Sequence, residues 1–387
     1  MKAVIAIDSL KGSLSSLEAG KAVAEGILRA VKDAEVSVHP LADGGEGTVE
    51  ALVQGMNGSL HSAKVTGPLG DPVACPYGIL PDNRTAVLEM AGAAGLTLVP
   101  AHRRNPLKTT TYGLGEAIKD AIGNGCRRFI IGIGGSATND GGAGMLQALG
   151  FEFLDKAGSP IPPGAEGLKD LAEIRTASAL PELRECSFRI ACDVTNPLCG
   201  PEGCSAIFGP QKGADARMIR NMDRWLMRYA GLAAQISPKA DRYKPGTGAA
   251  GGLGFAFLSF TNAVLESGIK IVLEETRLEE AIRTADYVIT GEGRLDAQTA
   301  MGKAPIGVAS LARRYRKPVI ALAGSVTDGA AACNQAGIDA YFPILRTVTT
   351  LEEAMDPVTA YSNLASAAEQ AFRLIAAVEN KSIKLKM

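Results

Sequence analysis

The sequence predicts an α/β protein of two domains, and two observations support that prediction. Short runs of β-branched residues alternate with helical patterns at both ends of the chain, as in KAVIAI and EVSVHP near its start. In the middle, Pro and Gly turns join the strands VTGPLGDPVACPYGIL and RTAVLEM. Alternation of strand and helix is typical of a parallel sheet, whereas short turns are typical of antiparallel pairing.

The two ends of the chain predict a single sheet. A helix over about 15–31 follows KAVIAI, and another begins near Glu46 after EVSVHP. The segments ADYVITGEG, KPVIALAG and DAYFPIL repeat the pattern before a last helix over about 350–378. We therefore predict a discontinuous, flavodoxin/Rossmann-like doubly wound domain over 1–72 plus 269–387. Residues 73–268 are expected to form an inserted mixed α/β domain, with the active site in the cleft between the two domains.

Composition narrows the class of protein. The 387 residues, 46% hydrophobic and 21% charged, can bury a large core. A formal charge of −1 with three histidines predicts no nucleic-acid or membrane partner. Seven cysteines without a C-x-x-C pair, and no apolar leader, favour reduced thiols in the cytoplasm. The apolar segment 245–265 contains several glycines and polar residues, so we expect a buried helix. Assembly into a homo-oligomer stays open.

The most unusual stretch is IGIGGSATNDGGAGM over 131–145, which has six glycines among fifteen residues after an apolar strand. A strand, a glycine-rich turn and a helix in succession often cradle phosphate oxygens, because glycine leaves backbone N–H groups accessible. A tight turn packed against a neighbour is the structural alternative.

A dinucleotide site competes for the same stretch. Gly132, Gly134 and Ala137 fit G-x-G-x-x-A, and Asp155 lies near the expected acidic position. An NAD-dependent oxidoreductase acting on a small hydroxy acid is therefore an alternative, and a non-catalytic binder of hydroxy acids is another. Against the dinucleotide reading, Gly141 and Gly142 fall where the first helical turn would form, at about 1 kcal/mol each.

Further loops combine glycine with carboxylates. DSLKGS, ADGGEGT and TGEGRLDAQT each follow a predicted strand, and such loops gather at the carboxyl edge of an open α/β sheet. The middle region adds CDVTNPLCGPEG, IFGPQKG and GTGAAGGLG. Phosphoryl transfer needs N–H donors, a carboxylate-held Mg²⁺, cations and a base, and these loops supply each type. Lys212 and Lys303 are among the cations, and no Walker A motif is present.

Seven motifs occur in a fixed order along nearly the whole chain: DSLKGS, LADGGEGT, GIGGSATNDGG, ACDVTNPLCG, FGPQKG, GAAGGLG and ITGEGRLDAQT. In this order they resemble the bacterial type I glycerate kinases, the glycerate 2-kinases. The resemblance implies an ATP- and Mg²⁺-dependent enzyme that converts D-glycerate to 2-phosphoglycerate and ADP. The choice of the 2-hydroxyl rests on this resemblance alone. Ile7 and Leu10 replace an expected Pro and Phe in the first motif.

The resemblance then suggests roles for individual residues, each a hypothesis. Asp193, at the end of the strand FRIAC, is the candidate base for the glycerate hydroxyl, and a turn or N-cap aspartate is its alternative. Lys11 and Arg294 are expected to pair the glycerate carboxylate. The residues expected to hold nucleotide phosphates are Gly134, Gly135, Ser136, Thr138 and Asn139, with Asp140 near Mg²⁺. The residues expected on the substrate side are Asp8, Ser9, Asp43, Glu46, Glu292 and Asp296, and metal binding is the alternative for the last four.

Overall fold

The computed structural model describes residues 1–42, 45 and 47–384. The chain divides into two compact units, in agreement with the predicted two-domain α/β class. Within the described residues, unit 1 comprises 1–42, 50–56 and 269–384, and unit 2 comprises 45, 47–49 and 57–268.

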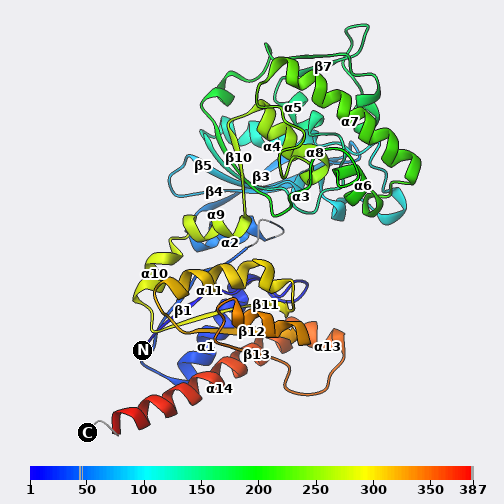
Figure 1. The fold of residues 1–387 in the computed structure, drawn as a ribbon. Coiled ribbons are helices and arrows are strands. Elements are labelled where there is room, and N and C mark those ends of the chain that lie inside the picture. The colour runs from blue at the N-terminus through cyan, green and yellow to red at the C-terminus, as the bar shows by residue number, and fades with distance from the viewer. Residues whose placement is uncertain (43–44, 46, 385–387) are drawn as a thin grey trace. The chain divides into compact units, whose positions relative to one another are not determined.

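Unit 1 is built by both ends of the chain, coloured blue and yellow to red in Figure 1. Its elements are β1 (Lys2–Ile5), α1 (Ser16–Ala30), β2 (Glu35–Val38), α10 (Leu278–Thr284), β11 (Tyr287–Leu295), α11 (Ala304–Arg314), β12 (Val319–Val326), α12 (Ala331–Gln335), β13 (Ala340–Pro343), α13 (Leu351–Met355) and α14 (Pro357–Lys384). Two helices, α2 (Thr48–Gly55) and α9 (Gly268–Glu275), lie where the chain passes from one unit to the other.

The sheet of unit 1 confirms the predicted doubly wound class. Its five strands are all parallel, in the order β2-β1-β11-β12-β13. Counted within the unit, this is the order 2-1-3-4-5 of flavodoxin-like sheets. The strand order reverses between β1 and β11, and ligands of such sheets bind beyond the carboxyl ends of the strands at that point.

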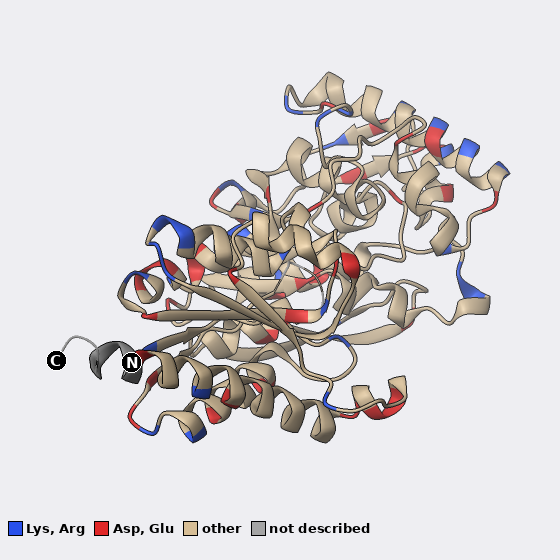
Figure 2. Cartoon of the chain, turned by 60° about the horizontal axis from the view of Figure 1, so that its bottom comes forward, with Lys and Arg blue, Asp and Glu red and all other residues tan. Residues whose placement is uncertain are grey.

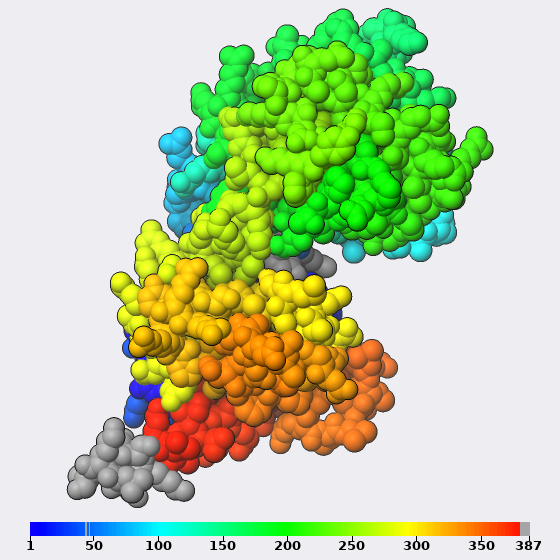
Figure 3. Space-filling view, viewed as in Figure 1, coloured from blue at the N-terminus to red at the C-terminus, as the bar shows by residue number. Residues whose placement is uncertain are grey.

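Helix α1 shows how the sequence specifies an element of unit 1. Ser15 and Glu18 form a capping box at its start, and its buried face packs against α14. The Tyr361 hydroxyl of α14 donates to Glu25 of α1 at 3.0 Å. In Figure 3, residues of the C-terminal segment, yellow to red, cover the visible face of unit 1 while blue N-terminal residues show only at its edge.

The predicted single helix over 350–378 is wrong in one respect, because the chain breaks it. Thr350 caps the short α13, and a new helix begins at Pro357. The residue before proline is disfavoured in the α-helical region. Asp356 accordingly adopts φ −57° and ψ 125°, which ends α13.

Unit 2 holds the middle of the chain, coloured cyan to yellow-green in Figure 1. Its elements are β3 (Ser59–Thr66), β4 (Pro72–Ile79), β5 (Thr85–Glu89), α3 (Ala91–Ala94), α4 (Tyr112–Gly123), β6 (Arg128–Gly132), α5 (Ala143–Ala148), β7 (Glu152–Leu154), β8 (Glu173–Arg175), β9 (Ser187–Ala191), α6 (Cys204–Phe208), α7 (Ala216–Ile236), α8 (Ala249–Phe260) and β10 (Ala263–Glu266).

The main sheet of unit 2 is mixed, as predicted, with the order β10-β9-β6-β5-β4-β3. The first four strands are parallel, whereas β4 pairs antiparallel with both β5 and β3. The predicted boundary at residue 73 differs from the observed division, because β3 pairs with β4 along its whole length and so belongs to unit 2. The other predicted boundary, between 268 and 269, coincides with the observed one.

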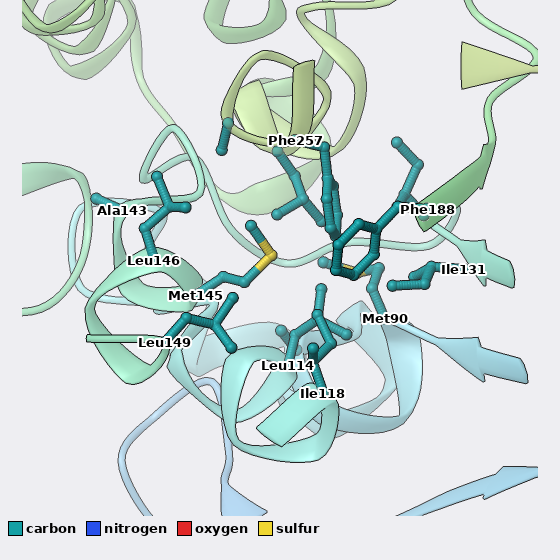
Figure 4. Packing of buried hydrophobic residues seen from close by; sticks show 14 of the residues in the cluster. Met90, Leu114, Ile118, Ile131, Ala143, Met145, Leu146, Leu149, Phe188 and Phe257 are labelled. Carbon is teal, nitrogen blue, oxygen red and sulfur yellow. The ribbon is translucent and has the colours of Figure 1, made fainter. Parts of the chain in front are cut away.

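The core of unit 2 explains where its apolar residues go. Figure 4 shows side chains of α4, α5 and the parallel strands converging, with Met145 among Leu146, Leu149 and Leu114. The rings of Phe188 and Phe257 lie 5.7 Å apart. The segment predicted as a buried helix is therefore core, as Phe257 is fully buried. The only tryptophan, Trp225 of α7, packs against this cluster and reports on unit 2.

Helix α8 begins with a backbone that is not helical. Ala250, Gly251 and Gly252 have positive φ angles of 51°, 68° and 94°. A Cβ at Gly251 would lie 2.1 Å from the carbonyl oxygen of Thr138, and the Gly251 carbonyl accepts from Gly141 N–H at 2.9 Å. Two glycine-rich motifs far apart in the sequence thus meet backbone to backbone.

The distribution of charged residues and the apolar character of the helices can be compared with what the composition predicts. Figure 2 shows Lys and Arg interspersed with Asp and Glu along the described chain. Within the described part of the chain, no helix combines the length and the apolar character that crossing a membrane requires.

We predict that Gly251→Ala destabilises unit 2 by about 3 kcal/mol, because the methyl group clashes with Thr138 and the residue is left-handed. Gly158→Ala is the matched control, since Gly158 has φ +79° but no atom near its added Cβ, and it should lose only about 1 kcal/mol. Urea unfolding followed by Trp225 fluorescence measures both. Equal losses would contradict the close approach.

Candidate active site

A pocket of about 480 Å³ lies in unit 1 at the carboxyl ends of β1 and β11, where the fold rule places a ligand. The segment after β1 contributes Asp8, Ser9 and Lys11. The end of β11 and the turn after it contribute Glu292, Arg294 and Asp296, and Lys303 precedes α11. This β1/β11 pocket therefore brings together six of the residues predicted to act on the substrate side or as catalytic cations. The predicted Asp43 and Glu46 lie outside the described residues.

Ion pairs hold the acidic wall of the β1/β11 pocket. Arg294 contacts Asp296 at 3.2 Å, and its side chain is 66% exposed. Lys303 lies 3.9 Å from Glu292 and 3.8 Å from Asp296. The cations of these pairs are exposed, whereas the side chains of Glu292 and Asp296 are only 12% and 13% exposed. Arg294 and Lys303 can therefore turn toward a ligand carboxylate at low cost.

The two carboxylates of this wall have opposite pKa shifts. Burial raises the pKa of Glu292, even though Thr299 donates a hydrogen bond to it at 2.6 Å. For Asp296, burial is outweighed by hydrogen bonds from Thr299 and Arg294, and the pKa is lowered. Paired groups whose pKa values move apart are typical of acid and base assignments in active sites. Glu292 is the group of this pocket best suited to accept or hold a proton.

The segment after β1 forms the opposite wall. Asp8 is 7% exposed and accepts the Ser9 N–H at 2.7 Å, while its own N–H donates to Gly291 at 2.9 Å. The bond to Gly291 fastens the segment to β11. Lys11 is exposed at the pocket. The position of Lys11 beside a fixed backbone suits a cation that must meet a small anion.

In unit 2, a second polar edge forms where the parallel strands end. Glu89, Gly132, Ala191 and Glu266 are the last paired residues of β5, β6, β9 and β10. The register places Gly132 beside Ala191, so the loop after β6 lies next to the segment that carries Asp193. Asp193 is exposed, and its carboxylate accepts the Gly268 N–H at 3.3 Å.

The loop of residues 133–142, named the glycine loop here, exposes only its first turn. Gly134 and Gly135 are exposed, and Gly135 has φ +73°. No acceptor within the described part of the chain pairs with the backbone N–H groups of Gly134, Gly135 and Ser136. Three consecutive unpaired N–H groups at a left-handed turn resemble the anion-binding concavities known as nests.

The rest of the glycine loop is interior. Asp140 is fully buried, and its carboxylate accepts four hydrogen bonds, two from Thr111 and one each from Gly142 and Gly144. Burial raises the pKa of Asp140 against the effect of these donors. A carboxylate so engaged has little capacity left for a metal. The predicted magnesium role of Asp140 stays a prediction, and the geometry supports a role in shaping the loop.

Thr138 and Asn139 are also fully buried. The Asn139 amide donates to Ser205 Oγ of α6 at 2.8 Å. The Thr138 hydroxyl and the side-chain amide oxygen (Oδ1) of Asn139 have no hydrogen-bond partner in the described structure. Of the five residues predicted at the phosphates, Gly134, Gly135 and Ser136 therefore reach the loop's outer turn, whereas Thr138 and Asn139 support it from inside.

The sequence did not predict that Lys212 contacts the glycine loop. Lys212 is 1% exposed and donates from Nζ to Ser136 Oγ at 2.8 Å and to the Thr138 carbonyl at 2.6 Å. Burial lowers the pKa of Lys212 to about 8. The motif FGPQKG named this lysine only as one cation among several, because nothing in the spacing shows that a loop 70 or more residues earlier covers it.

The sites of the two units together indicate a class of enzyme. A flavodoxin-like sheet with a pocket for a small anion, and a mixed sheet with a glycine loop suited to phosphate, are typical of an enzyme acting on small phosphorylated molecules.

Comparison with known proteins identifies the family. Residues 3–376 match the model of the glycerate kinase family. A glycerate kinase of Bacillus subtilis strain 168 is 50% identical over 93% of this chain and 94% of the relative. Glycerate 2-kinase of Escherichia coli K12 is 49% identical over 95% and 96%. A crystal structure assigned to glycerate kinase 2 of Salmonella typhimurium LT2 has a TM-score of 0.91 at 48% identity, and the match covers 98% of this chain and 99% of that one.

The chain belongs to the glycerate kinase family. The predicted resemblance is confirmed, and so are the two-domain α/β class and ATP-dependent phosphorylation of glycerate as the activity. The comparisons do not support the NAD-dependent alternative.

The buried lysine predicts a measurable pH dependence of stability. Because the pKa of Lys212 falls from about 10.4 in the unfolded chain to about 8 in the folded one, the unfolded state binds more protons between these values. Unfolding free energy therefore rises with pH across that window. From pH 7.5 to 10, the unfolding free energy of the wild type should rise by roughly 2 kcal/mol relative to that of Lys212→Met. Urea titrations at each pH measure it, and a flat difference would show that the ammonium is solvated.

Proposed function

We propose that this protein transfers the γ-phosphoryl group of ATP to the 2-hydroxyl of D-glycerate, giving 2-phosphoglycerate and ADP. The observation that supports the proposal most directly is the first turn of the glycine loop, with three unpaired N–H groups beside a buried ammonium. Phosphoryl transfer depends on positioning and on stabilising charge, and such donors serve both needs.

The nucleotide phosphates are proposed to bind at Gly134, Gly135 and Ser136. The backbone N–H groups of these residues offer three donors, and glycine lets phosphate oxygens approach the chain closely. Thr138 and Asn139 hold the turn from below. The neighbouring strand end brings Asp193 to the same edge of the sheet.

D-Glycerate is proposed to bind in the β1/β11 pocket. Lys11 and Arg294 would pair its carboxylate through charge-assisted hydrogen bonds. Asp8 and Ser9 would meet its hydroxyl groups, and Glu292 and Asp296 complete the wall. The pocket volume of about 480 Å³ lies within the usual range for small-molecule sites.

Two carboxylates compete for the role of base. Asp193 is the first candidate, because a strand end holds its carboxylate at the same edge as the glycine loop. Glu292 is the second, because it lies in the pocket with Lys11 and Arg294 and burial raises its pKa. A base positioned at the hydroxyl is worth about 10²–10⁴ in rate, which makes the two separable.

Magnesium is proposed to arrive with ATP. Among the described residues, no group of three or more His, Cys, Asp or Glu side chains could hold a metal ion. This fits magnesium, which commonly binds substrate phosphates and water with only one or two carboxylates. A cytoplasmic location is proposed from the seven cysteines, all of them free thiols.

The product tests the proposed function. Purified protein with ATP, Mg²⁺ and D-glycerate should yield 2-phosphoglycerate, identified by NMR. 3-Phosphoglycerate would retain the kinase and overturn the regiochemistry. Absence of any phosphorylated acid under conditions where the protein is folded would contradict the proposal.

Substitution separates the candidate bases. Asp193→Asn should lower kcat by roughly 100-fold or more with an unchanged thermal transition, while Glu292→Gln should have a smaller effect on kcat. If Glu292→Gln produces the large loss and Asp193→Asn does not, the base is Glu292. Steady-state kinetics at saturating glycerate decide.

The proposed pairing of Lys11 and Arg294 with the glycerate carboxylate predicts a change in KM. Lys11→Met and Arg294→Met should each raise KM for glycerate roughly 10- to 100-fold, because each removes a charge-assisted bond. Arg313→Met is a suitable control, since Arg313 is an exposed cation of the same unit on α11. An unchanged KM in either variant would remove that residue from the site.

A further inference from the structure

Lys212 is the buried charged group that the proposed chemistry leaves unexplained. Its side chain is 1% exposed, yet neither of its hydrogen-bond acceptors is a carboxylate. Both acceptors are neutral oxygens of the glycine loop, the Ser136 hydroxyl and the Thr138 carbonyl. Buried charges are normally paired, because removing an ion from water is costly. A buried charge that no carboxylate of the described residues accepts indicates that a ligand supplies the countercharge.

The surroundings of the ammonium are otherwise well defined. An ammonium group has three donors, and the third hydrogen of Lys212 has no acceptor within the described structure. The titratable groups that interact with it are Asp140 and Cys204 of α6, while Tyr229 of α7 interacts with Asp140. Asp140 is already committed to four donors. The countercharge of Lys212 is therefore incomplete.

The hydrogen bond from Lys212 orients the hydroxyl group of Ser136. Because the Ser136 oxygen accepts from Lys212, its own O–H hydrogen remains free to donate, and no acceptor for it occurs among the described residues. Ser136 adjoins the exposed turn at Gly134 and Gly135. A polarised hydroxyl beside three unpaired N–H groups forms a donor set for a phosphate oxygen.

We propose that Lys212 is a positioning residue for the nucleotide: its buried ammonium orients the Ser136 hydroxyl toward a phosphate of the nucleotide and supplies the charge that balances it. This inference rests on the proposed binding of phosphates at the glycine loop. Lys212 acts through Ser136 and the field of the loop, since its own nitrogen is covered.

Binding of ADP without magnesium tests this inference, by calorimetry at pH 7.5 and 9.5. Lys212→Met should weaken binding roughly tenfold or more at pH 7.5, because a charge-assisted donor set loses its charge. The wild type should bind roughly tenfold more weakly at pH 9.5 than at pH 7.5, because Lys212, with a pKa of about 8, becomes neutral. Lys212→Met should show no such change. A phosphate ester has a second pKa near 6, so ADP keeps its charge throughout.

A double mutant separates positioning from packing. If Lys212 acts through Ser136, then Ser136→Ala should add little to the effect of Lys212→Met, whereas independent effects would multiply. Lys212→Arg provides a further check, because a guanidinium stays charged and should remove the pH dependence while retaining binding. Trp225 fluorescence confirms that each variant is folded. Should Lys212→Met not fold, the pH profiles of the wild type and Lys212→Arg decide, since only the wild type should lose affinity at pH 9.5.

The outcomes distinguish this inference from the proposed nucleotide site. Gly135→Asp places a negative charge on the exposed turn, and Gly135→Asn is its uncharged match at the same left-handed position. If both bind ADP equally well, the loop is not the phosphate site and the proposed function loses its nucleotide assignment. If Gly135→Asp alone weakens binding but Lys212→Met does not, or if the pH dependence persists in Lys212→Met, the inference about Lys212 is overturned.

Discussion

The backbone contact between the glycine loop and the start of α8 is the constraint on which unit 2 depends. Gly251 and Gly252 approach residues 138–141 so closely that neither can carry a side chain without moving the neighbouring backbone. This contact fixes the inner half of the loop, with Asp140 buried beneath four donors. The outer turn is held in place as a consequence, and its N–H groups are ready for an anion before any ligand binds. Preorganised donors of this kind need no rearrangement when charge develops.

The glycines of this loop therefore have two different functions, which the sequence could not separate. Gly141 and Gly142 allow close packing against α7 and α8, whereas only Gly134 and Gly135 are exposed. The structural alternative of a tightly packed turn describes the inner half of the loop, whereas phosphate binding at the outer turn stays a prediction. Periodicity and composition report which residues are small, but not which of them meet a neighbour. That information resides in long-range contacts such as the one between Thr138 and Gly251.

Unit 1 was more accessible to prediction. Alternating strands and helices specified a parallel sheet, and the rule for strand order then located the pocket beyond β1 and β11. Lys11 lies in the segment after β1, and Glu292 and Arg294 lie at the carboxyl end of β11, so the fold class was enough to bring them together. The boundary at residue 73 was misplaced because antiparallel pairing of β3 depends on a partner later in the chain. The burial of Lys212 was hidden for the same reason, since its cover comes from residues 136–138.

The central claim is that each unit holds one substrate: the glycine loop the nucleotide phosphates, and the β1/β11 pocket the glycerate. Hydrogen exchange measured by mass spectrometry tests it most directly, with ADP and D-glycerate added separately. ADP should slow exchange at residues 134–136, whose N–H groups have no acceptor among the described residues, and D-glycerate should slow exchange at 8–11 and 292–296. Protection of the β1/β11 pocket by ADP, with no change at 134–136, would contradict the account.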